Sequence, residues 1–155
     1  MKKILIFTLL LFISPLLQAA EDYPDEFLKA IKVKNPDQLD VYYYAATECP
    51  LTKHELKELV SGVLIRSRVK PLLGVEWVFD SLYLNVALSC IERKSTNQWI
   101  YKFDIYFGRW DVEPPISYQS DYDSFGIGPK QFIKDHVKEN VENAMTAFIK
   151  ANFNL

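Results

Sequence analysis

The sequence of 155 residues is poor in the side chains that bind metals, with two cysteines and two histidines. A structural or catalytic metal site needs several such ligands close together. His54 and His136 stand far apart, each beside the apolar stripe of a different predicted helix. We therefore predict no metal site, and no pattern in the sequence indicates any other cofactor.

Sequence motifs for catalysis are also missing. None of the serines lies in a Gly-x-Ser-x-Gly motif, which positions the nucleophile of many hydrolases. The cysteines are not arranged as Cys-x-x-Cys, the usual spacing of a redox pair. The segment from Asp121 starts like a calcium-binding loop, but Phe125 and Phe132 occupy two positions that must supply oxygen. These absences favour a protein that is not an enzyme.

The chain has no excess of positive charge, since 18 Lys and Arg residues stand against 20 Asp and Glu residues. Proteins that bind nucleic acid usually carry a basic patch or stripe. We therefore predict that nucleic acid is not a partner. Internal repeats and low-complexity tracts are absent as well, and residues 20–155 have the length of one ordinary domain.

The one long apolar run, from Ile4 to Ile13, lies between Lys2-Lys3 and Ser14-Pro15. A basic start, an apolar core of about ten residues and a small residue at the cleavage point are typical of a secretory signal peptide. A membrane-spanning helix needs roughly 20 apolar residues. We predict that residues 1–19 are removed after Ala19, that the remaining chain spans no membrane, and that the protein is periplasmic or secreted.

Export gives a meaning to the two cysteines, Cys49 and Cys90. Disulfides persist in oxidising compartments, and an even number of cysteines in an exported chain indicates pairing. A bridge that closes a loop of about 40 residues stabilises the folded state by roughly 4 kcal/mol in the chain-entropy model. We predict a structural Cys49–Cys90 disulfide rather than a redox-active pair.

The region between the cysteines contains a well-marked helix that follows a strand. Residues 41–46 are rich in tyrosine and begin with valine, which favours a strand. Thr52 and Glu55 form a predicted capping box, and the apolar residues after them repeat with helical spacing. That stripe consists of Leu56, Leu59, Val60, Val63 and Leu64. The helix ends before Pro71, because the residue before a proline disfavours helical angles.

Two further strands and a final helix follow. Residues 82–91 and 98–107 alternate in polarity on either side of a short polar turn, which predicts an antiparallel hairpin. Residues 75–79 fit either a loop or a short extra strand. Pro129 suits the first turn of a helix, and the helical pattern continues to about Asn152.

The order strand, helix, strand, strand, helix predicts an α+β fold. We expect a small single-layer sheet, mixed parallel and antiparallel, with two helices on one face and one disulfide. The crossover through the first helix makes the first two strands parallel, so Cys49 and Cys90 meet at one edge of the sheet. The face without helices carries Tyr42, Tyr44, Tyr83, Asn85, Ala87, Ser89, Lys102, Asp104 and Tyr106.

Residues 108–128 show neither a helix nor a strand pattern and are predicted to form a long aromatic loop. Loops of this length are uncommon and often functional, and their aromatic side chains argue against disorder. Either this loop covers the helix-free face, or a partner does. Exposed aromatic residues anchor partners, so the candidate binding residues are Tyr42, Tyr44, Tyr106, Trp110, Tyr118 and Tyr122.

These features predict an exported protein of the cell envelope that binds a protein or glycan partner and is not an enzyme. One alternative is a small exported hydrolase whose site is assembled by the loop. Its acids are Asp104, Asp111, Glu113, Asp121 and Asp123. A second alternative is an inhibitor of an exported enzyme, which agrees with the size and the disulfide. No residue pattern specifies the ligand or the oligomeric state.

Overall fold

The computed structural model describes residues 23–72, 82–94, 96–110, 117–119 and 124–153. These residues form three helices and one six-stranded sheet. None of the helices among them is long and apolar enough to cross a membrane. The predicted signal peptide, residues 1–19, and the ambiguous segment 75–79 lie outside the described residues.

Three long strands form the centre of the sheet, as their alternating polarity predicts. Strand β1 (Gln38–Ala45) runs parallel to β3 (Leu82–Arg93), and β3 pairs antiparallel with β4 (Gln98–Arg109). Each strand extends beyond its predicted range at one end. The extensions include polar residues such as Gln38 and Arg93, which backbone pairing holds in the sheet although they do not alternate with apolar neighbours.

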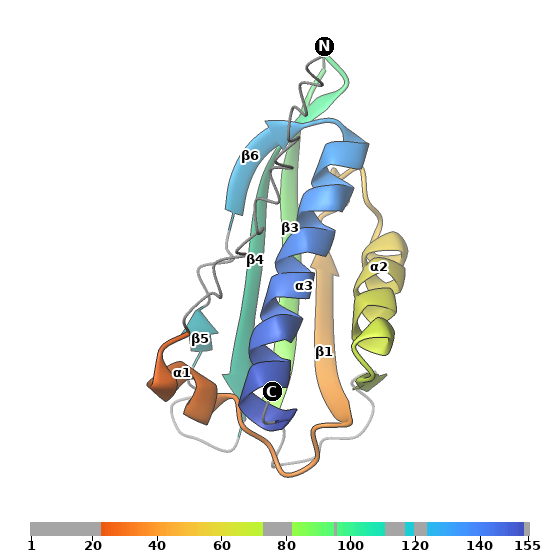
Figure 1. The fold of residues 1–155 in the computed structure, drawn as a ribbon. Helices are drawn as coiled ribbons and strands as arrows, with labels where there is room; N and C mark the ends of the chain where they lie inside the picture. The colour runs from red at the N-terminus through yellow and green to blue at the C-terminus, as the bar shows by residue number, and fades with distance from the viewer. Residues whose placement is uncertain (1–22, 73–81, 95, 111–116, 120–123, 154–155) are drawn as a thin grey trace, which may run out of the picture.

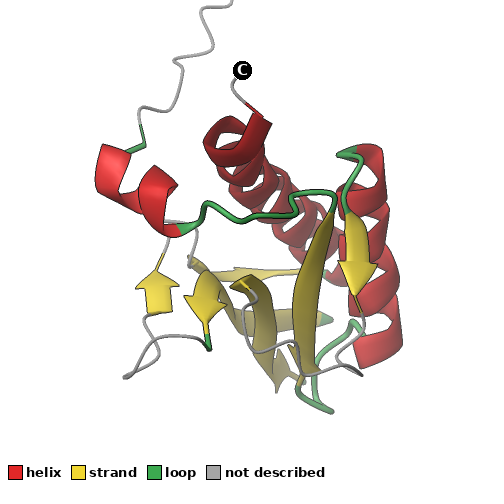
Figure 2. Cartoon of the chain, turned by 90° about the horizontal axis from the view of Figure 1, so that it is seen from below, coloured by secondary structure: helices red, strands yellow, loops and turns green. Residues whose placement is uncertain are grey.

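Helices α2 (Lys53–Arg66) and α3 (Lys130–Phe153) cover the same face of the sheet, as Figures 1 and 2 show. The predicted capping box is present at the start of α2. The Glu55 amide donates to the Thr52 hydroxyl at 3.2 Å, and the Thr52 amide donates to the Glu55 carboxylate at 2.8 Å. The predicted α+β class, with two long helices on one face of a mixed sheet, is confirmed.

A short helix, α1 (Asp25–Ala30), precedes the sheet and lies near the C-terminal end of α3 (Figure 1). The side chain of Asn152 accepts from the Val33 amide at 2.9 Å and donates to the Ile31 carbonyl at 3.2 Å. The ring of Phe27 lies 6.4 Å from that of Phe107. These contacts hold the chain that leads into β1 against the core.

The core lies between the sheet and the two long helices. Its largest fully buried side chains include Phe103 and Phe107 of β4 and Phe148 of α3. The rings of Phe107 and Phe148 stack with 6.1 Å between centroids and 19° between planes. Full burial of a phenylalanine stabilises by about 1.5–3 kcal/mol, so these residues contribute strongly to the docking of α3 on the sheet.

The segment 108–128 differs from its prediction as a loop without regular structure. Strand β4 continues through Arg109, and two short strands follow, β5 (Ser117–Gln119) and β6 (Ser124–Gly128). Both pair antiparallel with β4. Three residues are too few for an alternating pattern, and glycines occupy every second position at the end of β6, which explains the wrong prediction. Residues 111–116 and 120–123 lie outside the described residues.

A further short strand, β2 (Lys70–Leu72), pairs parallel with β1 and was not predicted. It forms one edge of the sheet, whose order is β2-β1-β3-β4-β5, with β6 also paired to β4. Its proline and its charged residue made a strand unlikely on propensity alone. Proline is tolerated there because an edge strand has one side without ladder bonds.

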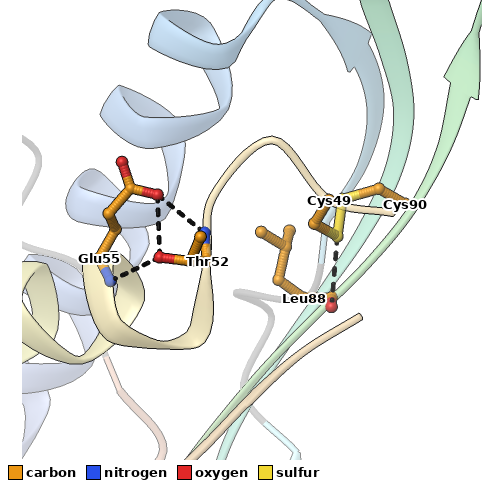
Figure 3. Close-up of a disulfide and its surroundings, with 5 residues drawn as sticks. All are labelled: Cys49, Thr52, Glu55, Leu88 and Cys90. Atoms are coloured by element: carbon orange, nitrogen blue, oxygen red, sulfur yellow. Dashed lines mark hydrogen bonds between the residues drawn. A yellow bond between two sulfur atoms is a disulfide. The ribbon is translucent and has the colours of Figure 1, made fainter. Parts of the chain in front are cut away.

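The predicted disulfide is confirmed. Cys49 follows the end of β1 and Cys90 lies in β3, with 4.9 Å between their Cα atoms (Figure 3). Strand pairing brings the two together, because the Ala46 amide donates to the Leu88 carbonyl at 3.0 Å. The Cys49 sulfur lies 3.6 Å from the same carbonyl oxygen. The bridge therefore ties the loop before α2 to the neighbouring strand.

Candidate binding surface on the open sheet face

We define the open face as the side of the sheet opposite α2 and α3. Strand register determines which residues share it. Tyr42 lies opposite Asn85, which lies opposite Tyr106, and the next row along the strands consists of Tyr44, Ala87 and Asp104. Side chains directly opposite one another in paired strands stand on the same side of the sheet. Both rows therefore carry a tyrosine of β1 and a small or polar residue of β3, and the first row also carries a tyrosine of β4.

Four aromatic residues of the open face form one connected group, which we call the aromatic cluster: Tyr42, Tyr83, Tyr106 and Trp110. Trp110 stacks on Tyr83 with 4.8 Å between ring centroids. Tyr42 meets Tyr83 edge-on at 5.3 Å, and Tyr106 lies 6.3 Å from Tyr83. Aromatic pairs in this distance range attract beyond their simple burial. Tyr83 is therefore the centre of the cluster.

Gly108 explains how Tyr83 lies within the cluster. The two residues are directly opposite each other in β3 and β4. A Cβ atom at Gly108 would lie 2.2 Å from the Tyr83 Cζ atom, so any other residue there would force the ring or the strand to move. The absence of a side chain therefore lets the tyrosine ring lie over the neighbouring strand, where 8% of it is exposed. Burial, followed by the nearby Tyr106 and Tyr42 hydroxyls, raises the pKa of Tyr83 above its ordinary value.

The predicted binding residues are only partly brought together. Tyr42, Tyr106 and Trp110 belong to the aromatic cluster, and 44% of Trp110 is exposed. Tyr44 stands in the next row, is 56% exposed, and makes no ring contact with the described residues of the cluster. Tyr118 belongs to β5, and its backbone pairs with Phe107 of β4, but the side chain of Tyr118 is not among the described parts of the structure. Tyr122 lies outside the described residues.

Tyr83 was not among the predicted binding residues, although it was placed on the correct face. Its buried, central position follows from the glycine across the strand pair. The sequence contained one indication of this position: extending the predicted hairpin by one residue places Gly108 directly opposite Tyr83. The signal was missed because Gly108 was assigned to the loop rather than to β4.

A second exposed group lies on the open face toward β6. Ile91, Ile100 and Ile127 stand directly opposite one another across β3, β4 and β6, and Phe125 pairs with Lys102 beside them. We call these four apolar residues the β6 patch. Ile91 is 67% exposed and Phe125 is 75% exposed. Their exposure gives the face a second apolar region that the sequence pattern did not indicate.

The charged groups of the open face do not form a catalytic arrangement among the described residues. The Lys102 ammonium lies 2.6 Å from the Asp104 carboxylate. Asp104 is also the one described member of the carboxylate set for the hydrolase alternative, since Asp111, Glu113, Asp121 and Asp123 lie outside the described residues. In the part of the chain that is described, no three His, Cys, Asp or Glu residues gather as metal ligands do. The described face offers aromatic and apolar contact area.

No protein-family model matches the sequence, and no curated protein matches it either. Among solved structures, the chain resembles the crystal structure of a minor lipoprotein from Acinetobacter baumannii. The two are 10% identical in sequence, and the match covers 74% of this chain and 92% of the lipoprotein with a TM-score of 0.32. A likeness this weak says nothing about function, which is inferred below from the chain's own residues.

Proposed function

We propose that the protein is an exported, non-enzymatic protein of the cell envelope that binds a protein or glycan partner through its open face. The predicted signal peptide supports export. The Cys49–Cys90 bridge agrees with an oxidising compartment, where disulfides persist. The described helices lie on the other side of the sheet (Figure 2), so none of them covers the aromatic cluster.

The arrangement of Trp110 on Tyr83 is the observation that carries this proposal. Tyr83 is buried and fixed over Gly108, and the indole ring that stacks on it remains 44% exposed. A rigid aromatic ring loses little conformational entropy when it binds, which favours affinity. Tyrosine and tryptophan are also the residues most enriched at the energetic centres of protein interfaces. The cluster therefore combines a fixed base with an accessible ring.

A capture experiment with matched variants tests the proposal. Immobilised wild-type protein and the double variant Tyr44→Ala/Tyr106→Ala are incubated with solubilised envelope proteins and, separately, with envelope glycan fragments. We expect the wild type to retain a specific component that the double variant loses. Ile65→Ala is the control, because Ile65 is 64% exposed on α2, away from the open face.

The outcome is decided by comparison with the control. Loss of capture in the Tyr44/Tyr106 variant but not in Ile65→Ala supports binding through the open face. Identical profiles for all three proteins, with unchanged circular dichroism, would exclude that face. No described residue favours the inhibitor or the hydrolase over this proposal.

A further inference from the structure

Two strands at the edges of the sheet, β2 and β6, differ in how they are protected against pairing with another strand. The edge strand β2 consists of Lys70, Pro71 and Leu72. A lysine and a proline are two common devices that prevent edge strands from accepting a partner. The strand β6 reads Ser124-Phe125-Gly126-Ile127-Gly128 and contains neither a charge nor a proline. Only β4 pairs with it among the described residues, so its outer edge has no described neighbour.

Both sides of the β6 edge present apolar side chains. On the open face, Phe125 is 75% exposed and Ile127 is 49% exposed, and Ile127 ends the row that begins at Ile91 and Ile100. On the helix side, Gly128 has no side chain, and the ring of Phe132 lies where its Cβ would be. Half of Phe132 remains exposed. Side chains point alternately to the two faces of a strand. A strand added beside β6 would therefore contact apolar groups of the protein on each of its two faces.

Two charged residues beside β6 in the described part of the chain, Lys102 and Lys130, are engaged with partners. Lys102, opposite Phe125, lies 2.6 Å from the Asp104 carboxylate. Lys130, two residues after the strand, lies 2.6 Å from the Glu55 carboxylate. A charged segment would therefore find no complementary group in β6 and would bring its own charge against Phe125 and Ile127. The edge is suited to an uncharged occupant.

We propose that the outer edge of β6 binds an extended, uncharged and apolar segment of a partner polypeptide as an additional strand. Main-chain hydrogen bonds to β6 supply affinity in this mode, and the side-chain contacts on the two faces supply specificity. The β6 patch selects apolar residues on one face of the added strand, and Phe132 selects them on the other. This site is separate from the aromatic cluster and does not depend on it.

A synthetic peptide tests the proposal directly. The probe is acetyl-Lys-Lys-Val-Ile-Val-Phe-Val-Lys-Lys-amide, in which the flanking lysines give solubility and the central five residues match the apolar edge. We expect saturable binding, shifts of the backbone amide signals of residues 124–128 in nuclear magnetic resonance spectra, and slower hydrogen exchange there. Two further versions of the peptide are N-methylated, one at the odd and one at the even central residues. Alternate amides of a strand point to the same side, so one version loses its central donors toward β6 and is expected to bind about tenfold more weakly or worse than the other.

Variants of the protein provide the second arm. Ile127→Lys places a charge at an exposed position of the edge and is expected to weaken peptide binding by about tenfold or more. Ile65→Lys, an exposed position on α2, is expected to leave it unchanged. The Tyr44→Ala/Tyr106→Ala variant is also expected to bind the peptide normally, which separates this site from the open-face proposal.

Three results would overturn the proposal. The first is peptide binding that leaves the amides of residues 124–128 unaffected. The second is equal affinity for the unmodified peptide and for both N-methylated versions, since one of the two lacks the donors toward β6 and equal affinity then excludes a hydrogen-bonded ladder. The third is a wild-type dimer that Ile127→Lys dissociates, because a second copy of the chain then occupies the edge. The peptide arms need no variant, so a folding defect in Ile127→Lys does not affect the test.

Discussion

At the scale of single residues, the open face depends on one close approach between β3 and β4. Gly108 has no side chain, and Tyr83 fills the space that a side chain would occupy. Tyr83 in turn supports Trp110 and touches Tyr42 and Tyr106. A change at Gly108 is therefore expected to affect the whole cluster.

Replacement Gly108→Ala is expected to displace the Tyr83 ring. The added Cβ would lie 2.2 Å from Tyr83 Cζ, so ring or strand must move. Forcing extra atoms into a packed site costs about 1–3 kcal/mol. We expect the free energy of unfolding in urea to fall by that amount and the near-ultraviolet circular dichroism of the cluster to change.

Gly62→Ala is the matched control for this prediction. Gly62 lies in α2, where an added Cβ would meet only an Arg66 guanidinium nitrogen, at 3.5 Å. Alanine in a helix interior is favoured over glycine by roughly 0.5–1 kcal/mol, so this variant is expected to be more stable than the wild type. If both variants gain stability, Tyr83 is not constrained by Gly108.

At the scale of elements, the start of α2 is fixed by Glu55. Its carboxylate accepts from the Thr52 amide and hydroxyl and binds the Lys130 ammonium at 2.6 Å. The bond from Lys130, followed by that from the Thr52 amide, lowers the pKa of Glu55 to about 2. The same group thus caps α2 and ties it to the first turn of α3.

This shift predicts how stability depends on pH. The folded-state pKa lies below the ordinary value of 4.5, so the contribution of Glu55 is present above pH 4.5 and is lost as the pH falls toward 2. Glu55→Gln keeps a side-chain oxygen that can accept from the Thr52 amide but loses the charge that binds Lys130, so it is expected to lower the free energy of unfolding at pH 7 by up to about 1 kcal/mol. Urea denaturation measures the free energy of unfolding of both proteins, and the difference between the variant and the wild type is expected to be smaller at pH 2.5 than at pH 7.

Glu58→Gln on the same helix is the control for pH dependence. Glu58 lies on the surface, 3.3 Å from His54 in an exposed pair. Surface pairs of this kind contribute about 0–1 kcal/mol, so a smaller loss is expected at pH 7. A Glu55→Gln difference that stays constant from pH 7 to pH 2.5 would contradict the assignment of the cap to an ionised carboxylate.

The elements also show what the sequence was able to predict. Long strands with alternating polarity, the capped helix and the disulfide were predictable, because each depends on local pattern or on two unique residues. The short strands β2, β5 and β6 were not, since pairing with β1 or β4 rather than local pattern holds them in the sheet. Placement of Tyr42, Tyr44 and Tyr106 on the helix-free face was predictable from period two alone. The central role of Tyr83 depended on strand register, which the sequence did not specify.

At the scale of the whole molecule, the Cys49–Cys90 bridge connects the region before α2 to β3 across 41 positions of sequence. The double variant Cys49→Ser/Cys90→Ser is expected to lose about 2–5 kcal/mol of stability, as small exported domains do without a native disulfide. Urea denaturation of the oxidised wild type, the reduced wild type and the variant measures this loss. Equal stability of all three would show that the bridge does not restrain the unfolded chain.

We infer that the molecule uses its open face, and not its helical side, to meet a partner. Photocrosslinking within the intact envelope tests it most directly. A benzoyl-phenylalanine is introduced at Tyr44 in one protein and at Ile65 in another, since both positions are more than half exposed and lie on opposite sides of the sheet. We predict a discrete crosslinked product from position 44 and none from position 65. A product from position 65 alone, or the same product from both positions, would contradict the claim.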